Sequence, residues 1–163
     1  MIVGATGHAT RRQREILVLA ALLGAALDLT FAFVFYSFQG ATPLGILRGI
    51  AAGLIGREEA RAAGAWVPVL GAALHFLIAC CAALIFYLAN RRWPTLLRHW
   101  ALGGASFGVA MYLVMHFVVI PLSRLPFHLP SLPNVLGELF SHIFLFGMVI
   151  AYGVARATRP ASV

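Results

Sequence analysis

Four apolar segments, each long enough to cross a lipid bilayer as a helix, restrict what this chain can fold into. A bilayer core requires roughly 20 helical residues, and these segments lack the alternating pattern of a transmembrane barrel. Lipid offers no partner to a bare backbone N–H group, so each span must be a helix. We therefore predict an all-α polytopic membrane protein, a four-transmembrane-helix bundle that forms one domain over residues 1–163. The spans are residues 16–38, 66–89, 100–121 and 136–155.

The composition agrees with a membrane protein, because the chain carries too little charge for a soluble domain. Of its 163 residues, 61% are hydrophobic and only 10% are charged, whereas soluble domains have about 25% charged residues. The basic residues are arginines at the ends of apolar runs, with no basic stripe of the kind that binds nucleic acid. We therefore expect the lipid bilayer, and no nucleic acid, as the partner. Cys80 and Cys81 adjoin within an apolar run, which predicts neither a disulfide framework nor a zinc finger.

The distribution of arginines predicts how the chain is oriented. Eight arginines fall on the side of the termini and four on the other side. Because the cytoplasmic side carries the excess of basic residues, we expect both termini in the cytoplasm. The first apolar run is too long for a signal-peptide core, so we expect it to be retained as a helix. The two sets are Arg11, Arg12, Arg14, Arg91, Arg92, Arg98, Arg156 and Arg159, and opposite them Arg48, Arg57, Arg61 and Arg124.

Both connections on the outer side carry structural signals. The first begins with a Thr-Pro helix start and continues with glycines every four residues, at Gly45, Gly49 and Gly53. Its apolar part is too short to span, so we predict an interfacial or re-entrant helix over residues 44–62. The second connection, "PLSRLPFHLPSLPN", has four prolines and is expected to be a stiff, extended cover.

Five ionisable residues lie inside the predicted spans. Such groups are costly in hydrocarbon and normally face protein or a wet cavity. In the first three spans they share a helical face with alanine and glycine, and small-residue faces are where membrane helices pack closely. We therefore predict that all five point inward, with the histidines and the glutamate in the outer half and the aspartate near the midplane. The residues are Asp28, His75, His116, Glu138 and His142.

Two further residues are candidates for an accessory role beside His116. Tyr112 lies one helical turn before it. Pro121, if helical, leaves the carbonyl of Phe117 without its donor and so provides a free acceptor near His116. The alternative is that Pro121 only ends the third span.

The residue types of this cluster leave several chemistries open. Imidazole and carboxylate groups bind divalent transition metals, and histidine also takes up or senses protons near neutral pH. Glu138 and His142, four residues apart on one helical face, could share an ion or a proton, or Glu138 could orient His142. Two histidines on facing helices could also hold a haem. Met111, Met115 and the cysteines fall off the histidine faces, which disfavours a copper(I) site, and Ser141 is expected to point away from His142.

From residue 66 to residue 155 the chain resembles the YagU-like family of bacterial inner-membrane proteins, a domain family of unknown function. The resemblance rests on His75 in "GAALHFLIA", on His116 and Pro121 in "HFVVIPL", and on Glu138 and His142 in "GELFSH". It implies a small multi-span protein of the bacterial inner membrane and marks these polar positions. The first span departs from the family pattern, so the resemblance implies nothing for Asp28.

The functional prediction is a proton- or metal-ion-responsive transporter or channel with a site at His75, His116, Glu138 and His142. One alternative is a membrane redox protein or enzyme subunit with haem or metal. Another is a structural or assembly subunit whose histidines only bond between helices. Whether the protein is an enzyme stays open. Gly104 and Gly108 form a GxxxG motif that could support a homodimer or pack within one chain.

Overall fold

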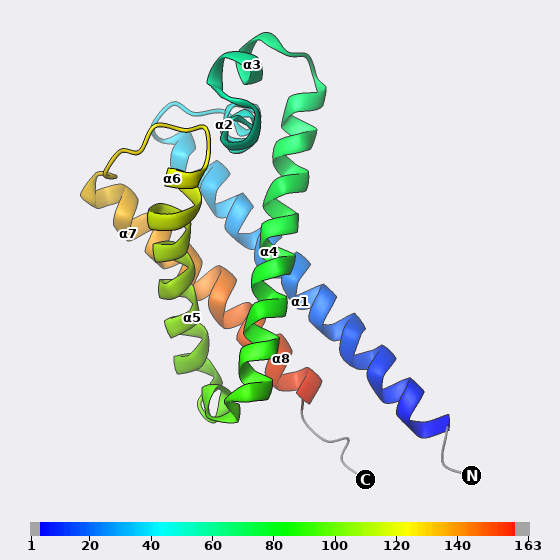
Figure 1. Cartoon of the computed structure of the whole chain (residues 1–163). Helices are drawn as coiled ribbons and strands as arrows, with labels where there is room; N and C mark the ends of the chain where they lie inside the picture. Colours follow the sequence, from blue (N-terminus) through cyan, green and yellow to red (C-terminus); the bar gives the residue numbers. More distant parts are fainter. Residues whose placement is uncertain (1–3, 159–163) are drawn as a thin grey trace.

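The computed structural model describes residues 4–158 and confirms the predicted all-α bundle, since every regular element in this range is helical. Four helical segments are long and apolar enough to cross a membrane: Arg11–Ser37, Trp66–Arg92, Trp100–Leu122 and Leu132–Thr158. Figure 1 shows them as one bundle with both termini at the same end. Arg159 lies outside the described residues.

In chain order the elements are α1 (Gly4–Ser37), α2 (Pro43–Ile55), α3 (Arg57–Ala62), α4 (Trp66–Arg92), the 3-10 turn η1 (Pro94–Leu97), α5 (Trp100–Val114), the π-helical turn η2 (Met115–Val119), α6 (Ile120–Leu122), α7 (Leu132–Phe140), the π-helical turn η3 (Ser141–Gly147) and α8 (Met148–Thr158).

The third and fourth spans are continuous helices that each contain a π-helical turn. The fourth begins at Leu132, four residues earlier than the sequence indicated. Pro133 sits in its first turn, where a helix does not need the N–H group that proline lacks. Pro121 is likewise helical, in the last turn of the third span. The irregular part of the connection between the third and fourth spans is therefore shorter than the predicted extended cover and consists of residues 123–131.

The connection between the first and second spans forms two helices instead of the single helix predicted over residues 44–62. The chain breaks at Gly56, whose φ of +98° is a backbone conformation that glycine adopts without steric cost. Helix α2 has 13 residues, too short to span, and starts where the Thr42 hydroxyl accepts a hydrogen bond from the Gly45 N–H at 3.1 Å. The Arg48 guanidinium donates to the Ala60 carbonyl at 2.7 Å, which holds α3 against α2.

Helices α2 and α3 lie at the end of the bundle opposite to the termini (Figure 1). We call this end the covered half and the end that carries the termini the terminal half. In the terminal half the spans pack through small side chains, as the alanine and glycine faces predicted. A Cβ on Gly153 of α8, for example, would run into the Ala20 side chain of α1. The buried core residues there include Ala21, Ala82, Ala83, Phe86, Ile150, Ala151 and Val154.

The GxxxG motif of α5 packs within the chain. A Cβ on Gly108 would overlap the carbonyl group of His142, and a Cβ on Gly104 would lie 2.7 Å from the Met148 Cα. These glycines therefore let the third and fourth spans approach at backbone distance. The homodimer stays a prediction, and this motif is not the surface that would form it.

Candidate functional site

The five ionisable side chains predicted to point inward all line one cavity of about 250 Å³ between the four spans. They come from α1, α4, η2, α7 and η3, so every spanning segment contributes to the site. Their side chains are between 12% and 22% exposed. The structure therefore brings together the residues that sequence reasoning selected, namely Asp28, His75, His116, Glu138 and His142.

Asp28 is the centre of one polar group, which we call the Asp28 group. The Ser141 hydroxyl donates a hydrogen bond to Asp28 Oδ1 at 2.6 Å. His142 Nδ1 lies 3.8 Å from the same oxygen, and His75 Nε2 lies 4.0 Å from Oδ2. Asp28 was expected slightly apart from the cluster, yet it contacts three partners from two other spans.

Glu138 is the centre of a second polar group, which we call the Glu138 group. The Tyr36 hydroxyl donates a hydrogen bond to Glu138 Oε1. His116 Nε2 lies 3.3 Å from Glu138 Oε2, and the His116 ring packs on the Tyr112 ring with centroids 4.5 Å apart. His116 Nδ1 is buried and has no hydrogen-bond partner among the described residues. When the ring hydrogen is on Nε2, toward Glu138, Nδ1 is a hydrogen-bond acceptor that no described residue uses.

His142 lies near Asp28 and bonds to the backbone of its own helix. Its Nδ1 lies 2.9 Å from the Glu138 carbonyl oxygen, and a carbonyl oxygen only accepts, so this nitrogen carries a hydrogen. By the same argument His75 Nε2 donates to the Ala25 carbonyl oxygen at 2.9 Å. In the neutral rings the other nitrogen of each histidine is then an acceptor. The site thus holds proton acceptors at three imidazoles and two carboxylates.

The two π-helical turns lie at the site. Turn η2 carries His116 and turn η3 carries His142. A π-helical turn bonds residue i to residue i+5, which widens the helix locally, and such turns are frequently found at functional sites. The wider turn explains why Ser141 and His142 both reach Asp28, although neighbours on a regular helix point apart.

The methionines of the third span also depart from the prediction. Met111 and Met115 were expected away from the histidine faces, yet both line the cavity. The widened turn that starts at Met115 changes the rotation per residue, so the positions inferred from a regular α-helix do not hold there. Pro121 provides no partner for His116, because the His116 Nδ1 is unpaired among the described residues. Pro121 instead lies one residue before the third span ends at Leu122.

The donor set fits a metal ion poorly. Among the described residues, no group of three or more histidine, cysteine, aspartate or glutamate side chains is arranged to hold a metal ion. Structural and catalytic zinc sites use at least three protein ligands around one point, whereas here the close pairs belong to two separate groups. The cavity of about 250 Å³ is also smaller than the roughly 300–1,000 Å³ typical of cofactor pockets. We therefore derive no chemistry through a metal or a haem.

Two residues of the site were missed at the level of sequence. Tyr36 was counted as part of the apolar first span, although it lies eight residues, about two turns, after Asp28. Ser141 was set aside because its neighbour is His142. The sequence pattern that points to both residues is a hydroxyl-bearing side chain inside a span, close to an ionisable residue.

Comparisons with known proteins add no assignment, because no protein-family model, no curated protein and no solved structure matches the chain.

Proposed function

We propose that this multi-pass membrane protein is a proton-responsive transporter or channel, in which the Asp28 and Glu138 groups take up and release protons. One observation carries the proposal: two largely buried carboxylates around one cavity each lie within 4.0 Å of a histidine nitrogen from another span. Ionisable side chains at membrane depth commonly mark proton relays and ion pathways. Histidine is the residue whose charge changes between about pH 5 and 8.

The most direct argument for proton binding comes from the Glu138 group. A proton can reside on the carboxylate or on His116, because Glu138 Oε2 and His116 Nε2 are 3.3 Å apart. The unpaired His116 Nδ1 then provides the second acceptor that a relay needs. The charged and titratable groups that face this pair are Asp28, Tyr36, His75, Tyr112 and His142.

A structural role has one observation in its favour. The bond from His75 Nε2 to the Ala25 carbonyl joins α4 to α1 and would hold two helices together without any titration. It does not account for the carboxylates, which a structural hydrogen bond does not require. We therefore assign His75 a bridging role beside the proton-binding groups.

We also propose that the protein lies in the bacterial inner membrane with both termini in the cytoplasm, so that the covered half faces outward. The arginine distribution supports this orientation. The inner-membrane location follows from the sequence resemblance to the YagU-like family alone, since no family model matches the chain. Reporter fusions at each terminus and at residue 128 test it. Cytoplasmic signals at the termini and an external signal at residue 128 are expected, and the reverse pattern contradicts the orientation.

Infrared difference spectroscopy between about pH 5 and 8 tests the proposed function without knowledge of the cargo. We expect a protonated-carboxyl band together with histidine bands in the wild type. The Glu138→Gln variant is expected to lose the part of the carboxyl band that comes from Glu138, to keep the part from Asp28, and to alter the histidine bands. His128→Gln is the matched control, because this histidine is exposed in the outer connection and is expected to remove only its own signal. A spectrum that Glu138→Gln leaves unchanged would contradict the proposal.

A further inference from the structure

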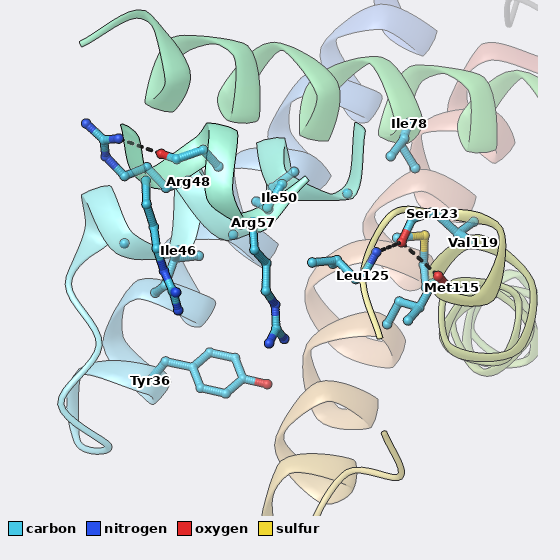
Figure 2. Close-up of a pocket in the computed structure, with 17 residues that line it drawn as sticks. Tyr36, Ile46, Arg48, Ile50, Arg57, Ile78, Met115, Val119, Ser123 and Leu125 are labelled. Atoms are coloured by element: carbon cyan, nitrogen blue, oxygen red, sulfur yellow. Dashed lines mark hydrogen bonds between the residues drawn. The ribbon is translucent and has the colours of Figure 1, made fainter. Parts of the chain in front are cut away.

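A second cavity of about 830 Å³ lies between α2, α3 and the outer end of the third span (Figure 2). We call it the vestibule. Its size lies within the range of about 300–1,000 Å³ found for ligand pockets. Three arginines line it, namely Arg48, Arg57 and Arg61. The vestibule therefore differs from the site cavity, where carboxylates and histidines supply the polar atoms.

Two of these arginines have guanidinium donors without a partner among the described residues. Arg48 donates to the carbonyls of Ala60 and Ala63, at 2.7 and 3.0 Å, and so has a structural role. In contrast, Arg57 and Arg61 make no side-chain hydrogen bond or ion pair with any residue that the structure describes. Figure 2 shows the Arg57 side chain pointing into the vestibule on the side of Tyr36.

No acidic side chain forms an ion pair with Arg57 or Arg61 among the described residues. Glu58 and Glu59 are on the same short helix, but neither lines the vestibule. Two guanidinium groups with open donors favour an anion, because guanidinium binds carboxylate and phosphate through paired hydrogen bonds.

The remaining walls are mostly apolar, which restricts the type of anion. A small hydrated anion gains little from such walls, whereas an anion with an apolar body buries that body against them. The ligand that fits has an anionic group at Arg57 and Arg61 and a hydrocarbon portion against the apolar walls. A short aliphatic carboxylate and the headgroup region of an acidic lipid share this chemistry. The apolar wall residues include Ile46, Ile50, Ile78, Val119, Ile120 and Leu125.

The vestibule adjoins the proton-binding cavity. Ile50, Ile78 and Met115 line both spaces. Tyr36 also lines the vestibule, and its hydroxyl donates to Glu138. An anion in the vestibule is thus one side chain away from the Glu138 group.

We propose that the vestibule binds an organic anion with an apolar body, of the short aliphatic carboxylate class, through Arg57 and Arg61, and that this anion is the solute that moves with the proton. Its role as solute rests on the proposed function, whereas its binding does not. A carboxylate and a proton carry no net charge together, so their joint passage avoids placing a bare charge in the bilayer core.

Equilibrium dialysis with radiolabelled hexanoate at pH 8 tests the binding. The protein is held in nanodiscs of phosphatidylcholine, which contain no acidic lipid. We expect saturable binding that unlabelled hexanoate displaces and that hexanamide, its uncharged analogue, does not displace. The double variant Arg57→Gln/Arg61→Gln is expected to bind at least tenfold more weakly. Gel filtration and circular dichroism check that this variant remains folded.

Arg124→Gln is the matched control, because Arg124 bonds to the Ile55 carbonyl at 3.3 Å on the same side of the protein but does not line the vestibule. It is expected to bind hexanoate as the wild type does. Binding that the double variant leaves unchanged, or that hexanamide displaces equally well, would overturn the proposal.

A lipid arm distinguishes the two sources of the anion. Protein from nanodiscs that contain phosphatidylglycerol is analysed for retained lipid by mass spectrometry. Retention of phosphatidylglycerol that depends on Arg57 and Arg61, without hexanoate binding, would assign the vestibule to a lipid headgroup and overturn the solute role. Failure of hexanoate binding leaves the infrared titration of Glu138 untouched, and failure of that titration leaves hexanoate binding untouched. Each proposal can therefore be rejected without rejecting the other.

Discussion

The terminal half and the covered half of the bundle are built from the same four spans but present different side chains to their cavities. In the terminal half, Ala151 and Val154 are fully buried, and Gly153 lies against Ala20 with no room for a side chain. In the covered half, a cavity of about 250 Å³ lined by ionisable side chains lies between the spans, the vestibule adjoins it, and the third and fourth spans contain two π-helical turns. A cavity of about 260 Å³ between α1 and α4 in the terminal half is lined mostly by apolar side chains. Glycines allow close contacts in both halves, so the halves differ chiefly in the side chains that face their cavities, which are mostly apolar at one end and ionisable at the other.

This difference assigns stability and function to different residues. In hydrocarbon, helices associate through close van der Waals packing instead of the hydrophobic effect. The alanine and glycine contacts of the terminal half can therefore hold the spans without help from the ionisable groups. The covered half can then keep costly charged residues around a cavity. Three substitutions test the comparison, from the largest expected effect to the smallest.

Gly153→Leu should have the largest effect, because it disrupts the terminal half. The new Cβ would overlap the Ala20 side chain, and the rest of the leucine has no space. We expect a loss of about 3 kcal/mol or more in the free energy of unfolding, measured by denaturation with sodium dodecyl sulfate in mixed micelles. Gly49→Leu is the matched control, since no atom lies within 4 Å of a Cβ at that position. Equal stability of the two variants would contradict the assignment of tight packing to the terminal half.

Ser141→Ala should have an intermediate effect, because it removes the hydrogen bond of 2.6 Å to Asp28. A hydrogen bond to a charged group contributes about 1.5–3 kcal/mol, and we expect a loss near the lower end in the same unfolding assay. The carboxyl bands in the infrared titration should also change, because Asp28 loses a donor. Ser141→Thr retains the hydroxyl and should restore both values at least in part. Carboxyl bands that Ser141→Ala leaves unchanged would show that Ser141 is not part of the proton-binding site.

His75→Phe should have the smallest effect on stability. It removes one bond, from His75 Nε2 to the Ala25 carbonyl, while keeping an aromatic ring in place. Hydrogen bonds between membrane helices contribute about 0.6 kcal/mol on average, so we expect a loss of that size in the unfolding assay. His75→Gln, which can still donate, should reduce the loss. A loss several times larger would show that the covered half also holds the bundle together.

The sequence was sufficient for the spans and for the inward direction of the ionisable residues, and insufficient for their detailed geometry. Long apolar runs and alanine faces gave the bundle, because membrane insertion and close packing depend on composition and on regular helical spacing. The contacts of Ser141 and the cavity positions of Met111 and Met115 depend on the π-helical turns. These turns break the regular spacing on which the prediction relied.

The connection between the first and second spans shows a second limit of prediction from sequence. Arg57 and Arg61 were read only as orientation signals, because in sequence they follow an apolar helix that is too short to span. The break at Gly56 turns α3 back on α2 and brings both arginines to the vestibule. A sharp turn of this kind depends on one backbone angle, +98° at Gly56, and neighbouring glycines in the same stretch remain helical.

The most direct test of the account is nitrogen-15 NMR of histidine-labelled protein in lipid bilayers, recorded between about pH 5 and 8. The account predicts that the neutral His116 ring carries its hydrogen on Nε2, toward Glu138, and that Nδ1 becomes protonated as the pH falls. Glu138→Gln should shift this transition, and His128→Gln should leave it in place. A His116 ring that stays neutral with unchanged shifts over the whole range would contradict the claim that these spans enclose a proton-binding site.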